Sequence, residues 1–125
     1  MRYLDLNILA AEHLLGSWDV LERPNGVASD TSVFAACRQV VFQDNGSVVV
    51  VGEAIKTGRW EIFKETEIIY NPQLHFNLGP EEADLNAIIT RYREDNEDGT
   101  FSRKVTLYFT SGLELVLEQK SDHPL

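Results

Sequence analysis

The sequence has little of several things, and each shortage excludes a class of protein. One cysteine, Cys37, stands among 125 residues, so no internal disulfide and no cysteine-based zinc site can form. The sequence has 11 lysines and arginines against 20 aspartates and glutamates, a net charge of −9. That balance argues against nucleic acid and anionic membranes as partners, because both require a cationic surface.

Long apolar runs are also missing. No run approaches the ~18 residues of a membrane-spanning helix, and residues 1–7 lack the uninterrupted apolar segment of a signal peptide. We therefore expect a cytoplasmic protein without membrane insertion.

Motifs for common chemistries are equally scarce. The sequence contains no Gly-x-Ser-x-Gly elbow and no glycine-rich phosphate loop. The acidic turn 94–99 resembles the start of a calcium loop, but Val105 occupies the twelfth position, where calcium needs a bidentate glutamate. No metal-ligand spacing relates the three histidines His13, His75 and His123. We expect no metal and no cofactor.

What the sequence does contain is a series of short strands separated by turn residues. Its length corresponds to one domain, residues 1–125. Apolar residues alternate with polar ones in most segments, and Asp44-Asn45-Gly46 is a strong hairpin signal. The pattern predicts strands over 17–23, 36–43, 47–53, 57–63, 67–70, 74–78, 85–93 and 101–109, and a last one from 113.

A helix is predicted before the first strand, over residues 5–15. Asp5 or Asn7 can cap its start, and Gly16 can end it in the left-handed conformation. Leucines recur on one stripe of this segment, so the helix should dock on an apolar surface.

These elements predict an all-β fold, an antiparallel up-and-down β-barrel of eight or nine strands, with the short N-terminal helix closing one end and residues 121–125 fraying. Closure removes the sheet edges that such a chain would otherwise expose. A sandwich is the alternative, but hairpins between sequential strands favour the barrel.

Three short motifs carry a resemblance to a known family. Gly16-Ser17-Trp18 follows the expected helix, Phe42-Gln43-Asp44-Asn45-Gly46 forms an aromatic-led hairpin turn, and Gly58-Arg59-Trp60 lies in a middle strand. In this order they resemble the small bacterial lipocalin-like (calycin) domains. The resemblance implies a barrel around a ligand cup, with Gly16 and Trp18 as its structural signature.

The sequence also departs from that family. The last strand offers no arginine to pack across Trp18, and the middle-loop Thr-Asp-Tyr motif is absent. The chain therefore resembles a distant, intracellular relative of the secreted lipocalins.

A ligand cup needs an apolar wall and a few inward polar groups. Strand alternation places Arg103 on the face of Leu107 and Phe109, and Arg91 on the face of Ile89. An inward arginine binds an anionic ligand group, pairs with a structural carboxylate or reaches solvent at the rim. The candidate ligand-binding residues are Arg103, Arg91, Trp60, Phe76, Phe101, Leu107, Phe109 and Leu115, and loop 24–34 would gate the mouth.

Three functions are compatible with this pattern. The leading hypothesis is non-catalytic binding of a small, mostly apolar molecule, with or without a carboxylate, because small inward residues such as Ala87 leave space beside the large ones. The alternative is a barrel filled by its own side chains, whose outer apolar residues Val116, Tyr108 and Phe63 meet a protein partner or form a homodimer. A small isomerase or decarboxylase using Glu61 or Glu22 ranks third, because alternation turns Glu61 outward.

Overall fold

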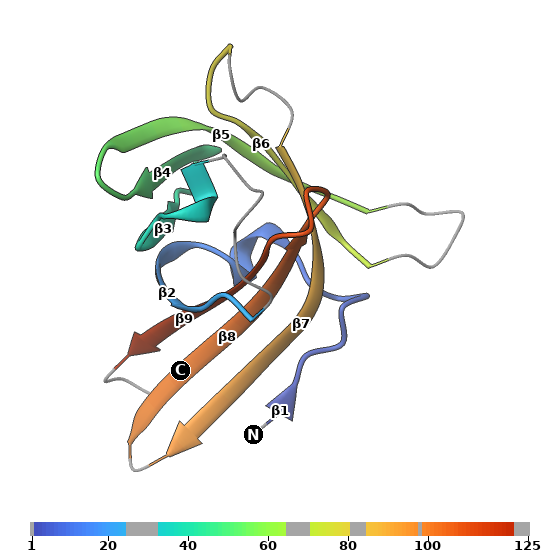
Figure 1. Ribbon diagram of the computed structural model, residues 1–125. Helices are drawn as coiled ribbons and strands as arrows, with labels where there is room; N and C mark the ends of the chain where they lie inside the picture. Colours follow the sequence, from blue (N-terminus) through green and yellow to red (C-terminus); the bar gives the residue numbers. More distant parts are fainter. Residues whose placement is uncertain (1, 25–32, 65–70, 81–84, 98, 122–125) are drawn as a thin grey trace.

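The computed structural model describes residues 2–24, 33–64, 71–80, 85–97 and 99–121 (Figure 1). Its elements, in chain order, are β1 (Arg2–Tyr3), η1 (Ala11–His13), β2 (Gly16–Glu22), η2 (Val33–Ala35), β3 (Gln39–Phe42), β4 (Ser47–Val51), β5 (Ile55–Phe63), β6 (Gln73–Asn77), β7 (Leu85–Glu97), β8 (Thr100–Phe109) and β9 (Glu114–Ser121). The elements η1 and η2 are single 3-10 turns.

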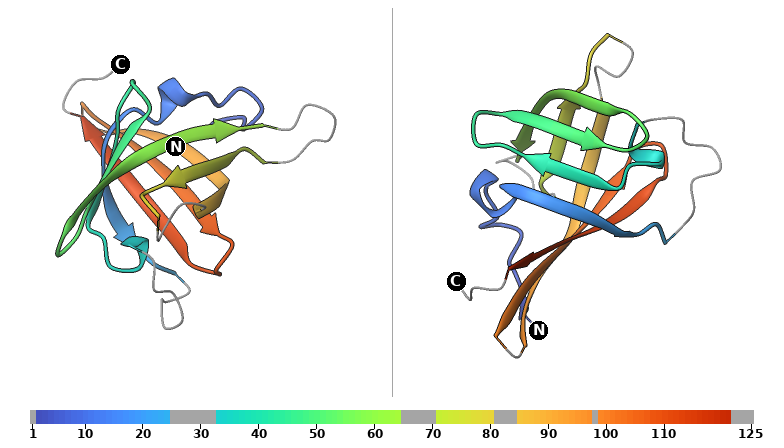
Figure 2. Two further views of the ribbon diagram at one scale, coloured as in Figure 1. Left: turned by 90° about the horizontal axis from the view of Figure 1, so that it is seen from above. Right: turned by 90° about the vertical axis from the view of Figure 1, so that its left-hand side faces the viewer.

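Strands β2 to β9 form a closed antiparallel barrel. Each strand pairs with the next along the chain, and β9 returns to pair with β2. The predicted up-and-down barrel is therefore confirmed as an eight-stranded one. Figure 2 shows the strands wrapping around a common interior.

The hairpin of β7 and β8 is much longer than its neighbours. Strand β6 pairs with β7 only as far as Ile88, whereas the β7–β8 ladder continues to the pair Glu97–Thr100. The far part of the hairpin, with the end of β9 paired to β8, extends beyond strands β3 to β6, beside the N-terminus (Figures 1 and 2). The extra strand β1, which the sequence did not predict, pairs with β7 there through Arg2–Glu94 and Tyr3–Arg93.

The predicted alternation is confirmed in most strands. On β6 the side chains of Leu74 and Phe76 are buried, and on β9 those of Leu115 and Leu117 are buried. The Asp44-Asn45-Gly46 turn also forms as predicted: Gly46 has a positive φ of 85° and its N–H donates to the Gln43 carbonyl at 3.1 Å. The sequence thus fixes the register of the β3–β4 hairpin locally.

The predicted N-terminal helix is wrong. No α-helix occurs in the described ranges, and within 5–15 the only regular element is the 3-10 turn η1. Its backbone N–H groups bond three residues back, from His13 to Ala10 and from Leu14 to Ala11, each at 3.0 Å. The Ala10 N–H instead donates to His13 Nδ1. A helix this short is not stable by itself in water. The backbone instead follows a course that buries both Leu9 and Leu14.

Other predicted segments changed or lie outside the described residues. The strand expected over 36–43 begins only at Gln39, after the turn η2. The expected strand 67–70, residues 25–32 of the gating loop and residues 122–125 of the fraying tail lie outside the described ranges.

Candidate functional site

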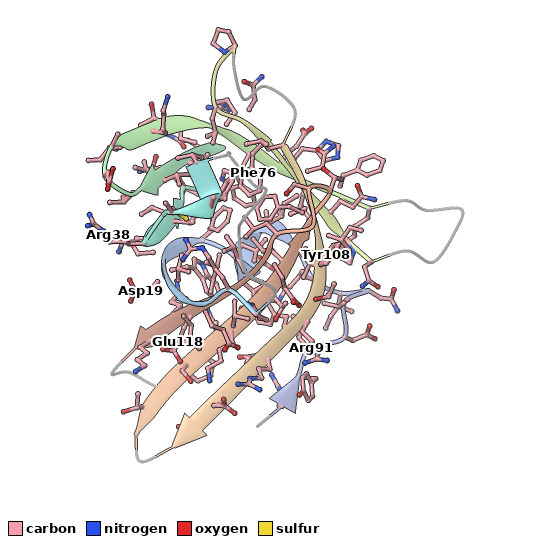
Figure 3. The ribbon with its side chains drawn as sticks, viewed as in Figure 1. Asp19, Arg38, Phe76, Arg91, Tyr108 and Glu118 are labelled. Carbon is pink, nitrogen blue, oxygen red and sulfur yellow. The ribbon has the colours of Figure 1, made fainter. Side chains whose placement is uncertain are left out.

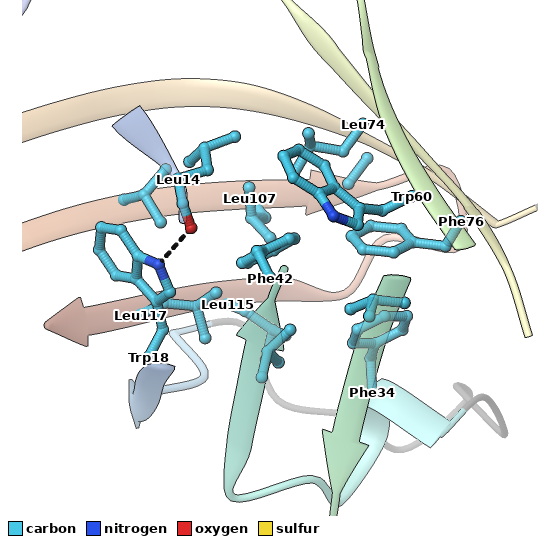
Figure 4. Packing of buried hydrophobic residues seen from close by; sticks show 14 of the residues in the cluster. Leu14, Trp18, Phe34, Phe42, Trp60, Leu74, Phe76, Leu107, Leu115 and Leu117 are labelled. Atoms are coloured by element: carbon cyan, nitrogen blue, oxygen red, sulfur yellow. Dashed lines mark hydrogen bonds between the residues drawn. The ribbon is translucent and has the colours of Figure 1, made fainter. Parts of the chain in front are cut away.

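The interior of the barrel is crossed by aromatic rings. Phe42 on β3 lies 4.9 Å from Trp60 on β5 and 6.1 Å from Phe76 on β6, between ring centroids. Strands β3 and β6 are not neighbours in the sheet, so this contact spans the interior (Figure 4). Aromatic side chains of this chain therefore meet across the interior.

A further ring of this cluster comes from the turn η2 and not from a strand. Phe34, carried by η2, is fully buried and packs 4.8 Å from both Phe76 and Phe109. Sequence reasoning placed Phe34 at the end of a polar gating loop and missed it as a core residue. The apolar run from Val33 to Cys37 is the signal that could have indicated it.

Beside Phe34, Arg23 and Cys37 tie η2 to the end of β2. The Arg23 guanidinium donates to the carbonyls of Phe34 and Cys37. Burial raises the pKa of the Cys37 thiol above its usual range, although the nearby Arg23 charge acts in the opposite direction. A buried thiol with a raised pKa is a poor nucleophile, so Cys37 has a packing role.

Trp18 and Tyr92 pack together toward the other end of the interior. Trp18 is fully buried, and its indole N–H donates to the Leu14 carbonyl at 2.8 Å (Figure 4). Its ring meets Tyr92 of β7 edge-on at 6.2 Å. The Tyr92 hydroxyl donates to the His13 carbonyl at 2.7 Å. This pair joins the N-terminal segment to the barrel, the structural role expected of Trp18 from its position beside Gly16.

Burial sets the protonation of Tyr92. Desolvation raises its phenol pKa to about 12; the Arg103 charge lowers it by a smaller amount, and Glu94 raises it further. A neutral, hydrogen-bonded phenol is a packing group rather than an acid or base at neutral pH.

At the glycines of the two Gly-x-Trp motifs, another segment of the chain approaches the backbone closely. Gly16 has a φ of +106°, and a Cβ there would lie 2.6 Å from Gln119 Nε2. A Cβ on Gly58 would strike the carbonyl oxygen of Asn77 on β6. Glycine is therefore required at both positions for backbone geometry or spacing.

Five of the eight predicted ligand-binding residues come together in the apolar core. They are Trp60, Phe76, Leu107, Phe109 and Leu115, and each is at least nine-tenths buried. The Trp60 indole N–H donates to the Gln43 carbonyl at 3.1 Å. These five residues are thus part of one buried apolar cluster.

Arg103 faces inward, as predicted, but lies past the apolar core in a polar network. Its Nε is 3.9 Å from Glu94 Oε2, and its Nη1 donates to Gln119 Oε1 at 3.4 Å. Its guanidinium also lies over the ring of Phe101, 4.9 Å from the centroid. Of the roles open to this arginine, pairing with a structural carboxylate is the one that these contacts favour.

The network continues to both flanking segments. Arg2 on β1 holds the other oxygen of Glu94 at 3.0 Å, and Gln119 Nε2 donates to the Leu15 carbonyl at 3.1 Å. Sequence alternation did not predict Glu94 as inward, because counting from Ile89 turns it outward.

The prediction that Arg91 faces inward is wrong. A β-bulge between Ile89 and Arg91 shifts the register of β7 against β8 by one residue. Tyr92 consequently faces the interior, and Arg91 is exposed on the outer face. Figure 3 shows Arg91 on β7, away from the interior ring of Phe76. A bulge reverses the alternation beyond it.

On the outer face, three apolar side chains and one glutamine form a row across four strands. Phe63 pairs with Gln73, Gln73 with Ile88, and Ile88 with Tyr108. The exposed fractions of Phe63, Ile88 and Tyr108 are 44%, 36% and 43%. We call these four residues the outer-face row. Val116, expected to join such a patch, is 9% exposed and does not contribute to it.

A shallow polar depression of about 280 Å³ borders this row, lined by Arg59, Trp60, Glu61, His75, Phe76, Asn77 and Asn86. Glu61 Oε1 lies 3.7 Å from His75 Nδ1, with its side chain 73% exposed. The His75 ring stacks on Phe63 at 5.5 Å. An ion pair this exposed is weak, and its carboxylate has the outward position predicted for Glu61.

Comparisons with protein-family models, with curated proteins and with solved structures found no match to this chain. The class is therefore defined by the fold: an all-β, closed eight-stranded antiparallel barrel with one extra strand. Within the described ranges, no helix is long and apolar enough to cross a membrane, and no group of three histidine, cysteine or acidic side chains could hold a metal ion.

Proposed function

We propose that this chain is a non-catalytic interaction barrel that binds a second copy of itself through the outer-face row. The observation that carries the proposal is the alignment of Phe63, Ile88 and Tyr108 in one cross-strand row on an exposed sheet face. The ring contacts across the interior support it, because they reduce the volume left for an internal ligand.

Charge permits a second copy as the occupant only at the outer-face row. The chain carries a net charge of −9, so two copies repel each other over most of their surfaces. The row itself contains no charged side chain, and the nearest carboxylates, Glu61 and Glu114, lie at its edges. Phenylalanine and tyrosine are also residue types enriched at the centres of protein interfaces.

The experiment is native mass spectrometry and sedimentation equilibrium over a range of protein concentrations. We expect a dimer for the unmodified chain and a monomer for Ile88→Glu, which puts a carboxylate in the middle of the row. Ile55→Glu is the matched control: Ile55 is 67% exposed and lies at the far end of β5, so this variant should remain a dimer.

A monomer at all concentrations, or a dimer that survives Ile88→Glu, would overturn the proposal. The same spectra test the ligand-binding hypothesis. A mass excess that disappears on denaturation would identify a bound small molecule and overturn the filled-interior argument.

A further inference from the structure

A second, smaller groove lies on the outer face where β2, β7, β8 and β9 meet. It has a volume of about 90 Å³ and is lined by Glu22, Arg91, Arg93, Lys104, Thr106 and Val116. The strand register explains this composition. Arg91 pairs with Thr106, Thr106 with Val116, and Val116 with Glu22, so these four side chains form one row. Arg93 and Lys104 form the adjacent pair of the β7–β8 ladder.

The cations around this groove make only long ion pairs within the described part of the protein. Within the described part of the chain, the side chains of Arg91, Arg93, Lys104 and Thr106 donate no hydrogen bond. Lys104 Nζ lies 3.8 Å from Glu118 Oε2, and Arg93 Nε lies 4.0 Å from Asp95 Oδ2. Both distances are too long for hydrogen bonds. The Arg93 Nε is also buried without a hydrogen-bond partner.

Buried donors without acceptors are costly, and the large majority in folded proteins are satisfied. The groove is lined by three cations and one carboxylate, Glu22, in a chain that carries a net charge of −9. Glu22 is exposed, so water screens its repulsion of an incoming anion. Arg93 and Lys104 each have one carboxylate about 4 Å away, whereas no ion pair or hydrogen bond is formed by the Arg91 guanidinium in the described part of the chain, so the lining favours an acceptor with negative charge.

We propose that this groove binds one small oxyanion group, a phosphate or a carboxylate. The guanidinium of Arg91 would bind it in a bidentate fashion, with Arg93, Lys104 and the Thr106 hydroxyl as further donors. Pockets for whole drug-sized ligands or cofactors measure about 300–1,000 Å³. The groove therefore fits the anionic end of a ligand. The β7 bulge creates this site, because it turns Arg91 outward beside Thr106.

The test is a titration of the ¹⁵N-labelled protein with inorganic phosphate at constant ionic strength, followed by amide NMR shifts. We expect saturable shifts at the groove residues, with a dissociation constant of the order of 1 mM. The double variant Arg91→Gln with Lys104→Gln should weaken binding by about tenfold or more.

The matched control is Lys56→Gln with Arg59→Gln, which removes the same charge from β5, outside the groove. It should keep the affinity within about twofold, because long-range electrostatics alone are screened by salt. The amide spectra of both variants also report whether the barrel is intact, so loss of binding and loss of fold are distinguished.

Parallel titrations with sulfate and with succinate distinguish the two sources of the oxyanion. Binding of phosphate and sulfate alone would assign the groove to a phosphoryl or sulfuryl group. Binding of succinate as well would extend it to carboxylates of free acids or acidic side chains. Absence of saturable shifts with all three, or equal weakening in both double variants, would overturn the proposal.

Discussion

The two halves of the β7–β8 hairpin have the same strand geometry but different inward faces. In the near half, Ile89 and Leu107 face inward and are buried in the apolar core. In the far half, Glu94 and Arg103 face inward and pair with each other. The near half is covered by the rest of the barrel, whereas the far half extends beyond strands β3 to β6 (Figure 1). Of the three roles that the sequence left open for Arg103, the structure favours pairing with a carboxylate near the end of the barrel.

The largest difference between the halves should appear when a ring is removed from each. Phe109→Ala in the near half should lower the free energy of unfolding by about 3–5 kcal/mol, because it empties a buried site. Phe101→Ala in the far half, where the ring is only half-buried, should cost about 1 kcal/mol. Urea unfolding followed by circular dichroism measures both. Equal costs would show that the far half is as tightly packed as the core.

Tyr92 stands between the two halves and makes the core sensitive to high pH. Burial raises its pKa to about 12 from an ordinary 10.0, so between these values the folded state retains a proton that the unfolded chain loses. The contribution is complete below pH 10 and is lost as pH rises toward 12, by roughly 2–3 kcal/mol.

Lysines and exposed tyrosines titrate in the same range, so the quantity to measure is the difference from Tyr92→Phe. That variant loses the hydrogen bond to the His13 carbonyl at a cost of about 1 kcal/mol, but its stability should fall less steeply above pH 10. Parallel pH profiles for the two proteins would contradict the buried-phenol account.

A smaller effect is expected for the polar network of the far half. Arg103→Leu should cost about 1 kcal/mol, because Glu94 keeps Arg2 as a second cation at 3.0 Å and is not stranded. A double-mutant cycle with Glu94→Gln isolates the pair. A coupling energy near zero would indicate that the Arg103 contacts with Gln119 and Phe101 outweigh the ion pair.

The smallest effect should come from Arg91. Because the bulge places this side chain on the outer face, Arg91→Ala should change the free energy of unfolding by about 0.5 kcal/mol or less. If Arg91 faced inward, the substitution would alter a buried site, and the same urea titration would show a large change in the free energy of unfolding. The neighbouring Tyr92→Phe serves as the comparison for an inward-facing position.

Alternation predicted the strands well wherever one face is buried and the other is wet. The β6 segment from Gln73 to Asn77 and the β8 segment from Thr100 to Phe109 match the predicted ranges to within one residue. The turn at Gly46 was equally clear, because its residues favour a positive φ. These signals are local, so a sequence displays them directly.

Much of the candidate site could not be predicted in this way. Phe34 enters the core from a turn without periodicity. The donors of the small groove come from β7 and β8, and only the bulge between Ile89 and Arg91 sets them side by side. The residues between Ile89 and Arg91 contain no sequence signal that would predict a bulge.

By itself the sequence determined an all-β chain of short antiparallel strands joined by tight turns, because side-chain alternation and turn chemistry depend on neighbours a few residues away. Tertiary structure alone decided three things: that residues 5–15 contain a short 3-10 turn in place of a helix, that Tyr92 faces inward in place of Arg91, and that rings from β3, β5 and β6 meet in the interior. The reason is physical. Each of these outcomes depends on burial against strands distant in sequence, and the free energy gained there exceeds the weak local preferences of the segments involved.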